Sequence, residues 1–169
     1  MLKKITLSAI TLIGLGLVAN NALAGTSTQP GSMCVKWNEG QPDISLSYSK
    51  IRNTSTSHYL YVDCPVVRTD FDGFLHDAAV EDSWVRVVDQ NWTYNNRCRL
   101  VSYSHNTNGS NSYWATGNVY SSGSNAGAQQ LNTNSLGGEN GASHLYFSCR
   151  IPPRYNGVYS SITTYKVWQ

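Results

Sequence analysis

Tryptophan and tyrosine are the residues of this sequence best suited to binding chemistry. The 169 residues include five tryptophans and eleven tyrosines but only three phenylalanines. Their rings pack against apolar groups yet keep a polar atom at the edge, which is why they recur on binding surfaces. A sugar stacks its C–H face on such a ring while nearby amides pair with its hydroxyls. Two segments combine these side chains with asparagine, and they supply the candidate ligand-binding residues Trp92, Tyr94, Asn95, Tyr113, Trp114, Asn118 and Tyr120.

Each aromatic residue also has a structural interpretation. Tyrosine and tryptophan fill cores and pair across neighbouring strands, and either role would explain any single ring. We expect Trp37 and Trp84 to lie in the core and Trp168 to fix the end of the last strand. The aromatic residues of the two asparagine-containing segments therefore carry the prediction of a glycan or cell-surface ligand.

Catalytic side chains form no recognisable set in the sequence. A nucleophile needs a base that a third group orients, and no G-x-S-x-G segment occurs. Paired carboxylates such as Glu81 and Asp82 are common in loops. No H-E-x-x-H spacing links the four histidines, which are His58, His76, His105 and His144. We predict no catalytic residue and keep a secreted hydrolase as a third hypothesis, behind binding and structural roles.

The segment Asp70-Phe71-Asp72-Gly73 has some features of a calcium loop. Calcium requires six to eight oxygen ligands, and Arg68 stands where the full pattern needs another aspartate. We predict an ordinary turn here, with calcium binding by Asp70 and Asp72 as the alternative. The sequence predicts no other metal site and no cofactor.

The N-terminal segment has the three parts of a secretory signal peptide. Lys3 and Lys4 are followed by an apolar run at 5–18, and Ala22-Leu23-Ala24 is a small-x-small cleavage signal. A membrane anchor is the alternative, but a spanning helix needs about 20 apolar residues. We predict cleavage between Ala24 and Gly25, no membrane insertion of the mature chain, and a secreted or periplasmic location.

All four cysteines follow the predicted cleavage site, in a compartment where disulfides persist. Four cysteines allow three pairings, which the spacing leaves open. Cys98 and Cys149 each lie within an alternating segment on its apolar side, whereas Cys34 and Cys64 lie nearer the N-terminus. We favour the pairs Cys34–Cys64 and Cys98–Cys149 over a zinc site, because no C-x-x-C spacing exists.

Charge favours no class of partner once the signal peptide is removed. The sequence has 12 basic and 10 acidic residues, and Lys3 and Lys4 belong to the signal peptide. The mature chain is therefore balanced, whereas nucleic-acid binding needs a basic face. We predict no nucleic-acid partner and read four arginines as a solvated strand face, namely Arg97, Arg99, Arg150 and Arg154.

Apolar residues recur with period two, which indicates β-strands. The predicted strands are 58–64, 84–89, 97–104, 112–120, 144–150 and 160–168, with 43–50 as a further candidate. Residues 121–142 form either a long loop or two loops around a weak strand at 129–131, and 74–79 has a short helix-like pattern. Short strands at this spacing predict an all-β, two-sheet antiparallel β-sandwich, jelly-roll-like or Ig-like and stapled by disulfides, over residues 25–169.

The mature chain resembles a loose group of small secreted bacterial proteins, frequent in myxobacteria and other proteobacteria. Their pattern is a first cysteine, a Tyr- and Asn/Ser-rich stretch, Cys-Pro, V-x-V-x-D, C-x-L, C-x-[IL]-P and I-x-x-Y-x-V. The matching residues are Cys34; 48–55; Cys64 and Pro65; Val85, Val87 and Asp89; Cys98 and Leu100; Cys149, Ile151 and Pro152; Ile162, Tyr165 and Val167. The resemblance implies export, two disulfides and one β-domain, and it names no substrate.

Three N-x-S/T sequences begin at Asn53, Asn91 and Asn108. Such sites are glycosylation acceptors in eukaryotes, whereas the resemblance is to bacterial proteins. We therefore interpret all three as surface turns.

Two functional hypotheses remain. The first is a non-catalytic secreted module that binds glycan or cell-surface material through aromatic-rich loops. The alternative is a structural or protein-interaction component of the envelope or extracellular matrix, which would use exposed strand edges or tyrosines. Neither hypothesis fixes the oligomeric state.

Overall fold

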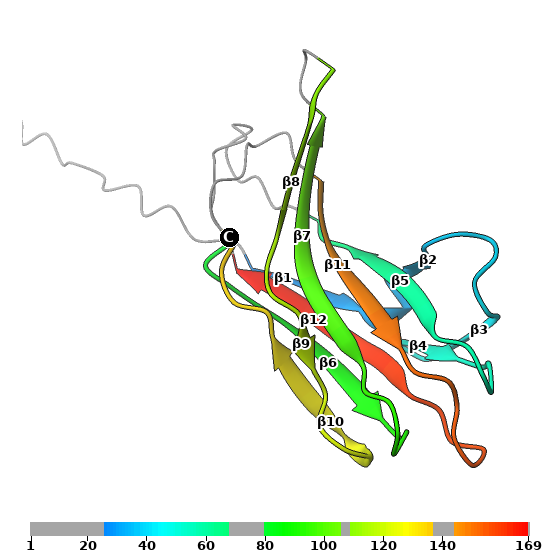
Figure 1. Ribbon diagram of the computed structural model, residues 1–169. Helices are drawn as coiled ribbons and strands as arrows, with labels where there is room; N and C mark the ends of the chain where they lie inside the picture. Colours follow the sequence, from blue (N-terminus) through cyan, green and yellow to red (C-terminus); the bar gives the residue numbers. More distant parts are fainter. Residues whose placement is uncertain (1–25, 68–79, 106–108, 137–143, 169) are drawn as a thin grey trace, which may run out of the picture.

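Alternating apolar and polar residues make most of this chain into two-faced β-strands, half-buried against a core. The computed structural model describes residues 26–67, 80–105, 109–136 and 144–168, and the statements below concern those ranges. The strands pair into two six-stranded antiparallel sheets. The predicted two-sheet antiparallel β-sandwich is therefore confirmed (Figure 1).

Sheet A contains the last strand of the chain at its centre. Its strands are β1 Thr26–Pro30, β3 Ile44–Ser47, β4 Lys50–Asn53, β6 Asp82–Asp89, β10 Asn125–Asn132 and β12 Ser161–Trp168. Their order is β10–β6–β12–β4–β3, and β1 pairs with the part of β12 that β4 does not reach. A short 3-10 helix, Gly31–Met33, follows β1 against β12. A Cβ atom on Gly31 would collide with the backbone of Ile162, so glycine is required there.

Sheet B carries both disulfides. Its strands are β2 Val35–Lys36, β5 Leu60–Pro65, β7 Arg97–His105, β8 Asn111–Ala115, β9 Val119–Tyr120 and β11 His144–Ile151. Their order is β2–β5–β11–β7–β8, and β9 pairs with the beginning of β7. Figure 1 shows β8, β7, β11 and β5 side by side as one layer.

The core lies between the inward faces of the two sheets. Fully buried side chains come from both sheets, among them Ile51, Leu60, Val62, Val85, Val87, Leu100, Phe147, Ile151, Ile162 and Tyr165. Tyr165 packs edge-on against Phe147 at 5.6 Å and donates a hydrogen bond of 2.8 Å to the carbonyl of Pro65. Because Tyr165 is in sheet A and Pro65 in sheet B, this bond ties the layers together. Burial raises the pKa of Tyr165 to about 12, so its hydroxyl stays a donor.

The disulfides join neighbouring strands within sheet B. Cys98 and Cys149 are register partners on β7 and β11, and Cys34 immediately precedes β2 and bonds to Cys64 of the adjacent β5. Both favoured pairings are therefore confirmed. Their sequence separations are 30 and 51 residues, so by the chain-entropy account each stabilises the fold by about 3 to 4 kcal/mol.

Several predicted strands have different bounds in the structure. The predicted strand 112–120 is split into β8 and β9, because the pairing with β7 shifts by one residue between them. The predicted strand 43–50 is also wrong as one unit, since the chain turns at Tyr48, whose φ is 55°, and returns as β4. The weak strand at 129–131 exists as the longer β10, while β1 and β2 were not predicted.

The two tryptophans predicted for the core have different positions. Trp37 is 66% exposed, so this prediction is wrong: the residue follows the two-residue edge strand β2 and lies on the outer face of sheet B beside Tyr61. Trp84 is buried, but on the outer face of sheet A, where it pairs in register with Lys166 of β12 and lies against Trp168.

Some predictions fall outside the described residues. These are the signal peptide at 1–24, the turn with Asp70 and Asp72, the helix-like segment 74–79 and Asn108. Within the described ranges, no helix has the length and apolar character needed to cross a bilayer.

Candidate functional site

Three loops meet at one end of the sandwich and form the framework of the candidate site. They connect β4 to β5, β6 to β7 and β11 to β12, and Figure 1 shows them at the same end of the molecule. A buried polar side chain fixes the first two loops, and a tight turn shapes the third. Each loop presents a ring or a cation next to the outer face of sheet B.

Asn53 fixes the loop between β4 and β5. Its side-chain amide donates to the carbonyls of His58 at 2.8 Å and Ile151 at 3.0 Å, while its oxygen accepts from the amide of Ser55 at 2.9 Å. Asn53 is completely buried, so its interpretation as a surface turn is wrong. These hydrogen bonds fix the path of the backbone that leads to Tyr59, which is the last residue before β5.

Asn91 fixes the loop between β6 and β7 in the same way. Its amide donates to the carbonyl of Pro153 at 2.9 Å, and its oxygen accepts from the amides of Thr93 and Tyr94 at 2.8 and 2.9 Å. Asn91 is also buried, against the prediction of a surface turn. The Asn91 side chain thus bonds to the residues that follow Trp92, and Asn91 itself precedes it. The loop around Trp92 is therefore held in one conformation.

The Asp89 carboxylate supports the same loop from below. It accepts hydrogen bonds from the amide of Asn91 at 3.1 Å, the amide of Asn96 at 3.3 Å and the hydroxyls of Ser121 and Ser160. Asp89 is completely buried. A buried carboxylate needs several donors of this kind, so the base of the loop is tied to β9 and β12.

The loop between β11 and β12 contains a tight Asn-Gly turn. Asn156 and Gly157 have φ values of 49° and 79°, and Tyr155 and Val158 exchange two backbone hydrogen bonds across them. Positive φ at both central residues is the pattern of a type I′ turn. The preceding Arg154 donates its backbone amide to the carbonyl of Ser55 at 2.8 Å, which joins this loop to the β4–β5 loop.

The loops bring two tyrosine rings and one guanidinium together. Tyr59 and Tyr94 pack edge to face with centroids 5.4 Å apart, and the guanidinium of Arg150 lies 4.2 Å from the Tyr59 ring centroid. Burial raises the pKa of Tyr59, and the opposing effect of nearby Arg150 is smaller. Its hydroxyl therefore remains a hydrogen-bond donor at neutral pH.

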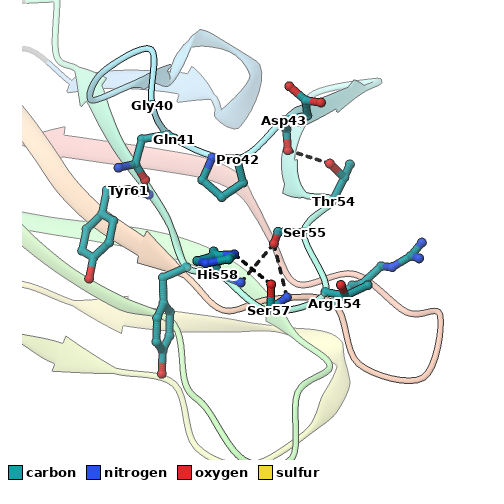
Figure 2. A pocket seen from close by; sticks show the side chains of 12 residues that line it. Gly40, Gln41, Pro42, Asp43, Thr54, Ser55, Ser57, His58, Tyr61 and Arg154 are labelled. Atoms are coloured by element: carbon teal, nitrogen blue, oxygen red, sulfur yellow. Dashed lines mark hydrogen bonds between the residues drawn. The ribbon is translucent and has the colours of Figure 1, made fainter.

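A polar groove adjoins this cluster. Its volume is about 830 Å³, and it is lined by Gly40, Gln41, Pro42, Asp43, Thr54, Ser55, Thr56, Ser57, His58, Tyr59, Tyr61 and Arg154. Figure 2 shows His58 near its middle, with Tyr61 and Gln41 on one side and Arg154 on the other. The Gln41 side chain accepts from the Tyr61 amide at 3.0 Å, which leaves its own amide donors for a ligand. The groove is thus open and lined mainly by hydroxyl and amide groups.

The groove also contains a serine beside a histidine. The Ser57 hydroxyl lies 2.8 Å from Nδ1 of His58, and both residues are exposed. A nucleophilic serine requires a third group that orients the base. Among the described residues, no carboxylate is hydrogen-bonded to the His58 ring. This pair can bind a hydroxyl group, but it lacks the support that activated nucleophiles have.

A row of side chains crosses the outer face of sheet B next to the groove. We call it the arginine–aromatic row, and its residues are Trp37, Tyr61, Arg150, Arg97 and Tyr120, each on a neighbouring strand or its extension. The side chains that alternate with these residues along each strand point inward and belong to the core. They include Cys98 and Cys149, which form one of the disulfides. Strand spacing of about 4.8 Å gives the row a span of about 20 Å.

The predicted ligand-binding residues on the β6–β7 loop lie close to this site. Trp92 is 75% exposed at the loop tip, and Tyr94 forms the edge-to-face pair with Tyr59. Asn95 is half-buried where the loop enters β7. These three residues therefore stand at the loop end of the sandwich.

The predicted residues from the second segment do not lie together. Tyr113 is exposed on β8, and Arg99 approaches its ring to 5.8 Å. Trp114 is half-buried and packs against the core. Asn118 is exposed between β8 and β9, and Tyr120 ends the arginine–aromatic row. Alternation along β8 separates Tyr113 and Trp114 onto opposite faces, so they cannot form one platform.

Other side chains of the site were not among the predicted residues. They are Trp37, Gln41, His58, Tyr59, Tyr61, Arg97, Arg150 and Arg154. Tyr59 and Tyr61 are two residues apart at the start of a strand, so period two alone places both on its outer face. The sequence predicts a solvated strand face for the arginines. In the structure Arg97 and Arg150 lie on the outer face of sheet B and are half-buried.

Metal ligands are not grouped in the described part of the chain. No cluster of three or more histidine, cysteine, aspartate or glutamate side chains there has the arrangement of an ion site. The side chains of the site are aromatic rings, guanidinium groups, hydroxyls and amides, together with the His58 imidazole and the Asp43 carboxylate.

Comparison with known proteins gives only distant likenesses. No protein-family profile and no curated protein sequence matches the chain. A solved structure of a family two carbohydrate esterase from Cellvibrio japonicus is similar over 86% of this chain, with 9% identity and a TM-score of 0.44. The match covers 34% of the esterase, so this chain spans about a third of that protein.

A second solved structure has a more similar length. It is the CBM36-1 domain of a multidomain xylanase from the hindgut metagenome of Trinervitermes trinervoides. Its TM-score is 0.43 at 9% identity, and the match covers 86% of this chain and 97% of that domain. The function of neither protein transfers to this chain, whose site has to be judged by its own residues.

Proposed function

We propose that this protein is a non-catalytic module that binds extracellular glycan at the loop end of sheet B. The observation that carries the proposal is the Tyr59–Tyr94 pair, held by loops that the buried Asn53 and Asn91 fix in place. A binding site gains affinity when its groups are ordered before the ligand arrives, because less entropy is lost. These rings have that property although they stand at the surface.

The surroundings of the pair suit a sugar chain. Sugar rings offer C–H faces to aromatic rings and hydroxyls to amides, and the groove supplies Gln41, Ser57 and His58 beside the rings. Trp92 on the β6–β7 loop and Trp37 beside Tyr61 add further aromatic surface, and both are exposed. An exposed tryptophan does little for the core, so these two side chains are available for stacking.

The two disulfides support an extracellular or periplasmic place of action. Such bonds persist outside the reducing cytosol, and both lie within the sheet that carries the site. Secretion through the predicted signal peptide, with cleavage before Gly25, is part of the proposal.

The test is binding of the mature chain, residues 25–169, to an array of polysaccharides that includes neutral and acidic chains. Tyr94→Ala should weaken binding at least tenfold, a loss of about 1.4 kcal/mol, because it removes half of the ring pair. Tyr113→Ala is the matched control, since this tyrosine has a similar exposure, lies on β8 of sheet B and does not line the groove. Absence of binding across the array, or equal loss in both variants, would reject the proposal.

A second candidate function is contact with another protein, and one hairpin favours it. Leu46 of the edge strand β3 is exposed, and Tyr48 at the hairpin tip is 99% exposed with positive φ. An unpaired edge with apolar side chains is a template for association. Cross-linking of the chain with and without Leu46→Lys tests this role, and a strictly monomeric chain without partners would exclude it.

A further inference from the structure

Two arginines stand directly opposite each other on the outer face of sheet B. Arg97 of β7 and Arg150 of β11 are register partners. Directly opposed side chains in antiparallel strands have Cβ atoms about 5 Å apart, and like charges at that distance destabilise a sheet. The register therefore places two like charges opposite each other in the middle of the arginine–aromatic row.

The flanking residues do not neutralise this pair. Along the row, the neighbour of Arg150 is Tyr61 and the neighbour of Arg97 is Tyr120. The carboxylate of Asp63 lies one pair of residues further along β5, where it accepts a hydrogen bond from Ser148 and is attracted to Arg99. Asp63 thus offsets Arg99, and the charge of Arg97 and Arg150 is left in excess.

Arg150 also has an unused donor. Its Nε atom is buried and has no hydrogen-bond partner among the described residues, while its guanidinium is stacked on Tyr59. A buried donor without a partner is unfavourable. The contact with the Tyr59 ring orders the Arg150 side chain, so less conformational entropy is lost when an anion binds its guanidinium.

We propose that Arg97 and Arg150 form an anion site that makes the protein selective for acidic glycans. This inference rests on the proposed glycan-binding function and specifies its ligand class. A carboxylate or sulfate on the sugar would bridge the two guanidinium groups, and an adjoining sugar ring would stack on Tyr61, the register partner of Arg150 on β5. Guanidinium groups recognise both anions through paired hydrogen bonds.

The charge distribution favours an acidic glycan over a nucleic acid. With Lys3 and Lys4 counted in the signal peptide, the mature chain has ten basic and ten acidic residues. Nucleic-acid binding depends on neutralising many phosphates over an extended basic surface. One arginine pair between tyrosines suits a polymer with isolated acidic groups and sugar faces between them.

The experiment compares each acidic polysaccharide with its uncharged derivative. The mature chain is titrated against polygalacturonate and its methyl ester, and against dextran sulfate and unmodified dextran, with single-stranded DNA as a further arm. The acidic member of at least one pair should bind ten times more tightly or better. Added salt should reduce this difference, because mobile ions screen exposed charges.

Variants assign the selectivity to the arginine pair. Arg97→Gln and Arg150→Gln should each abolish most of the tenfold preference, and Arg150→Lys should restore only part of it, because lysine keeps the charge but not the planar fork. Arg86→Gln, at an exposed position on the outer face of sheet A, is the matched control. Melting temperatures of all variants show that the fold is intact.

Each outcome has a distinct meaning. Equal affinity for charged and uncharged derivatives would overturn the anion site but leave glycan binding in place. Selectivity that survives both glutamine variants would overturn it as well. Tighter binding to DNA than to every polysaccharide would replace it with nucleic-acid recognition. Absence of binding to any polysaccharide would instead reject the proposed function itself.

Discussion

The two outer faces of the sandwich both combine aromatic rings with cations, but they arrange them differently. On sheet A, the Arg86 guanidinium lies 4.8 Å from the Trp84 ring, and the Lys166 ammonium lies 3.9 Å from the Trp168 ring. The two indoles also contact each other, with centroids 6.4 Å apart. Every member of this group has a partner within the group, and Trp84 is consequently buried.

On sheet B, the corresponding side chains are covered less completely. Trp37 and Tyr120 are exposed at the two ends of the arginine–aromatic row, and two arginines face each other in its middle. Cation–π contacts contribute about 0.5 to 1 kcal/mol at exposed sites whichever sheet they occur on. The two faces therefore differ in how far their rings are exposed and in whether like charges lie opposite each other. A composition rich in tryptophan, tyrosine and arginine does not by itself distinguish a structural face from a binding face.

Removing one tryptophan from each face should give the largest difference between the two sheets. Trp84→Ala should lower the free energy of unfolding by about 3 kcal/mol, because it removes a buried ring that two cross-strand neighbours cover. Trp37→Ala should change it by less than about 0.5 kcal/mol, as exposed substitutions do. Chemical denaturation of both variants measures the two values.

Glycan binding should show the opposite order. Trp37→Ala should weaken binding to the polysaccharide identified on the array, while Trp84→Ala should leave the affinity unchanged at temperatures where the variant is folded. A large stability loss in Trp37→Ala, or weaker binding in folded Trp84→Ala, would show that the faces are not divided in this way.

A smaller effect should follow from loosening the loop beside sheet B without altering a ring. Asn91→Ala removes the donor to Pro153 and the acceptor for Thr93 and Tyr94. Buried groups that lose their partners cost about 2 kcal/mol in total, which a shift of the denaturation midpoint would report. Binding should weaken about tenfold at the same time, because Tyr94 is no longer held against Tyr59.

Sheet A offers the control for this variant. Asn132 is an exposed asparagine on β10 whose oxygen accepts from the Gln130 amide at 2.9 Å. Asn132→Ala should change neither stability nor binding measurably. If Asn91→Ala lowers stability but leaves glycan affinity intact, the order of the loop is irrelevant to the ligand.

The parts of the fold that were predicted correctly depend on short-range patterns. Alternation along 144–150 separates Leu145, Phe147 and Cys149 from the polar face, and the structure buries these three residues. Because Cys98 also lay on an apolar face, a bridge between two neighbouring strands was a natural expectation. The sandwich and the bridge between Cys98 and Cys149 could be predicted for this reason, whereas no local pattern identifies Cys34 as the partner of Cys64.

The site could be predicted only in part, because its key contacts are remote in sequence. Asn53 bonds to the carbonyl of Ile151, which is 98 residues away, and Asn91 bonds to that of Pro153, which is 62 residues away. Both asparagines have the local sequence of a surface turn, so nothing nearby reveals their burial. The opposition of Arg97 and Arg150 likewise depends on the register of β7 and β11, which no local pattern fixes.

The smallest expected effect concerns Asp63, a carboxylate on the cationic face of sheet B. Burial raises its pKa above the usual value, and the hydrogen bond from Ser148 and the charge of Arg99 oppose this shift only in part. A raised pKa means that the folded chain holds the proton more firmly than the unfolded chain. The stabilisation of the fold by protonated Asp63 is therefore present in acid and is lost as the pH rises through the pKa of Asp63 in the folded state.

Asp63→Asn removes the titration and keeps an acceptor for the Ser148 hydroxyl. The variant should melt slightly higher than the unaltered chain at neutral pH, and the gap should close in acid, as melting curves between about pH 3 and about pH 8 would show. Asp82→Asn, at an exposed carboxylate of sheet A, controls for the loss of one negative charge. A lower melting point of Asp63→Asn at neutral pH would mean that attraction to Arg99 outweighs the cost of burial. The cations of sheet B would then already be satisfied within the protein, as those of sheet A are.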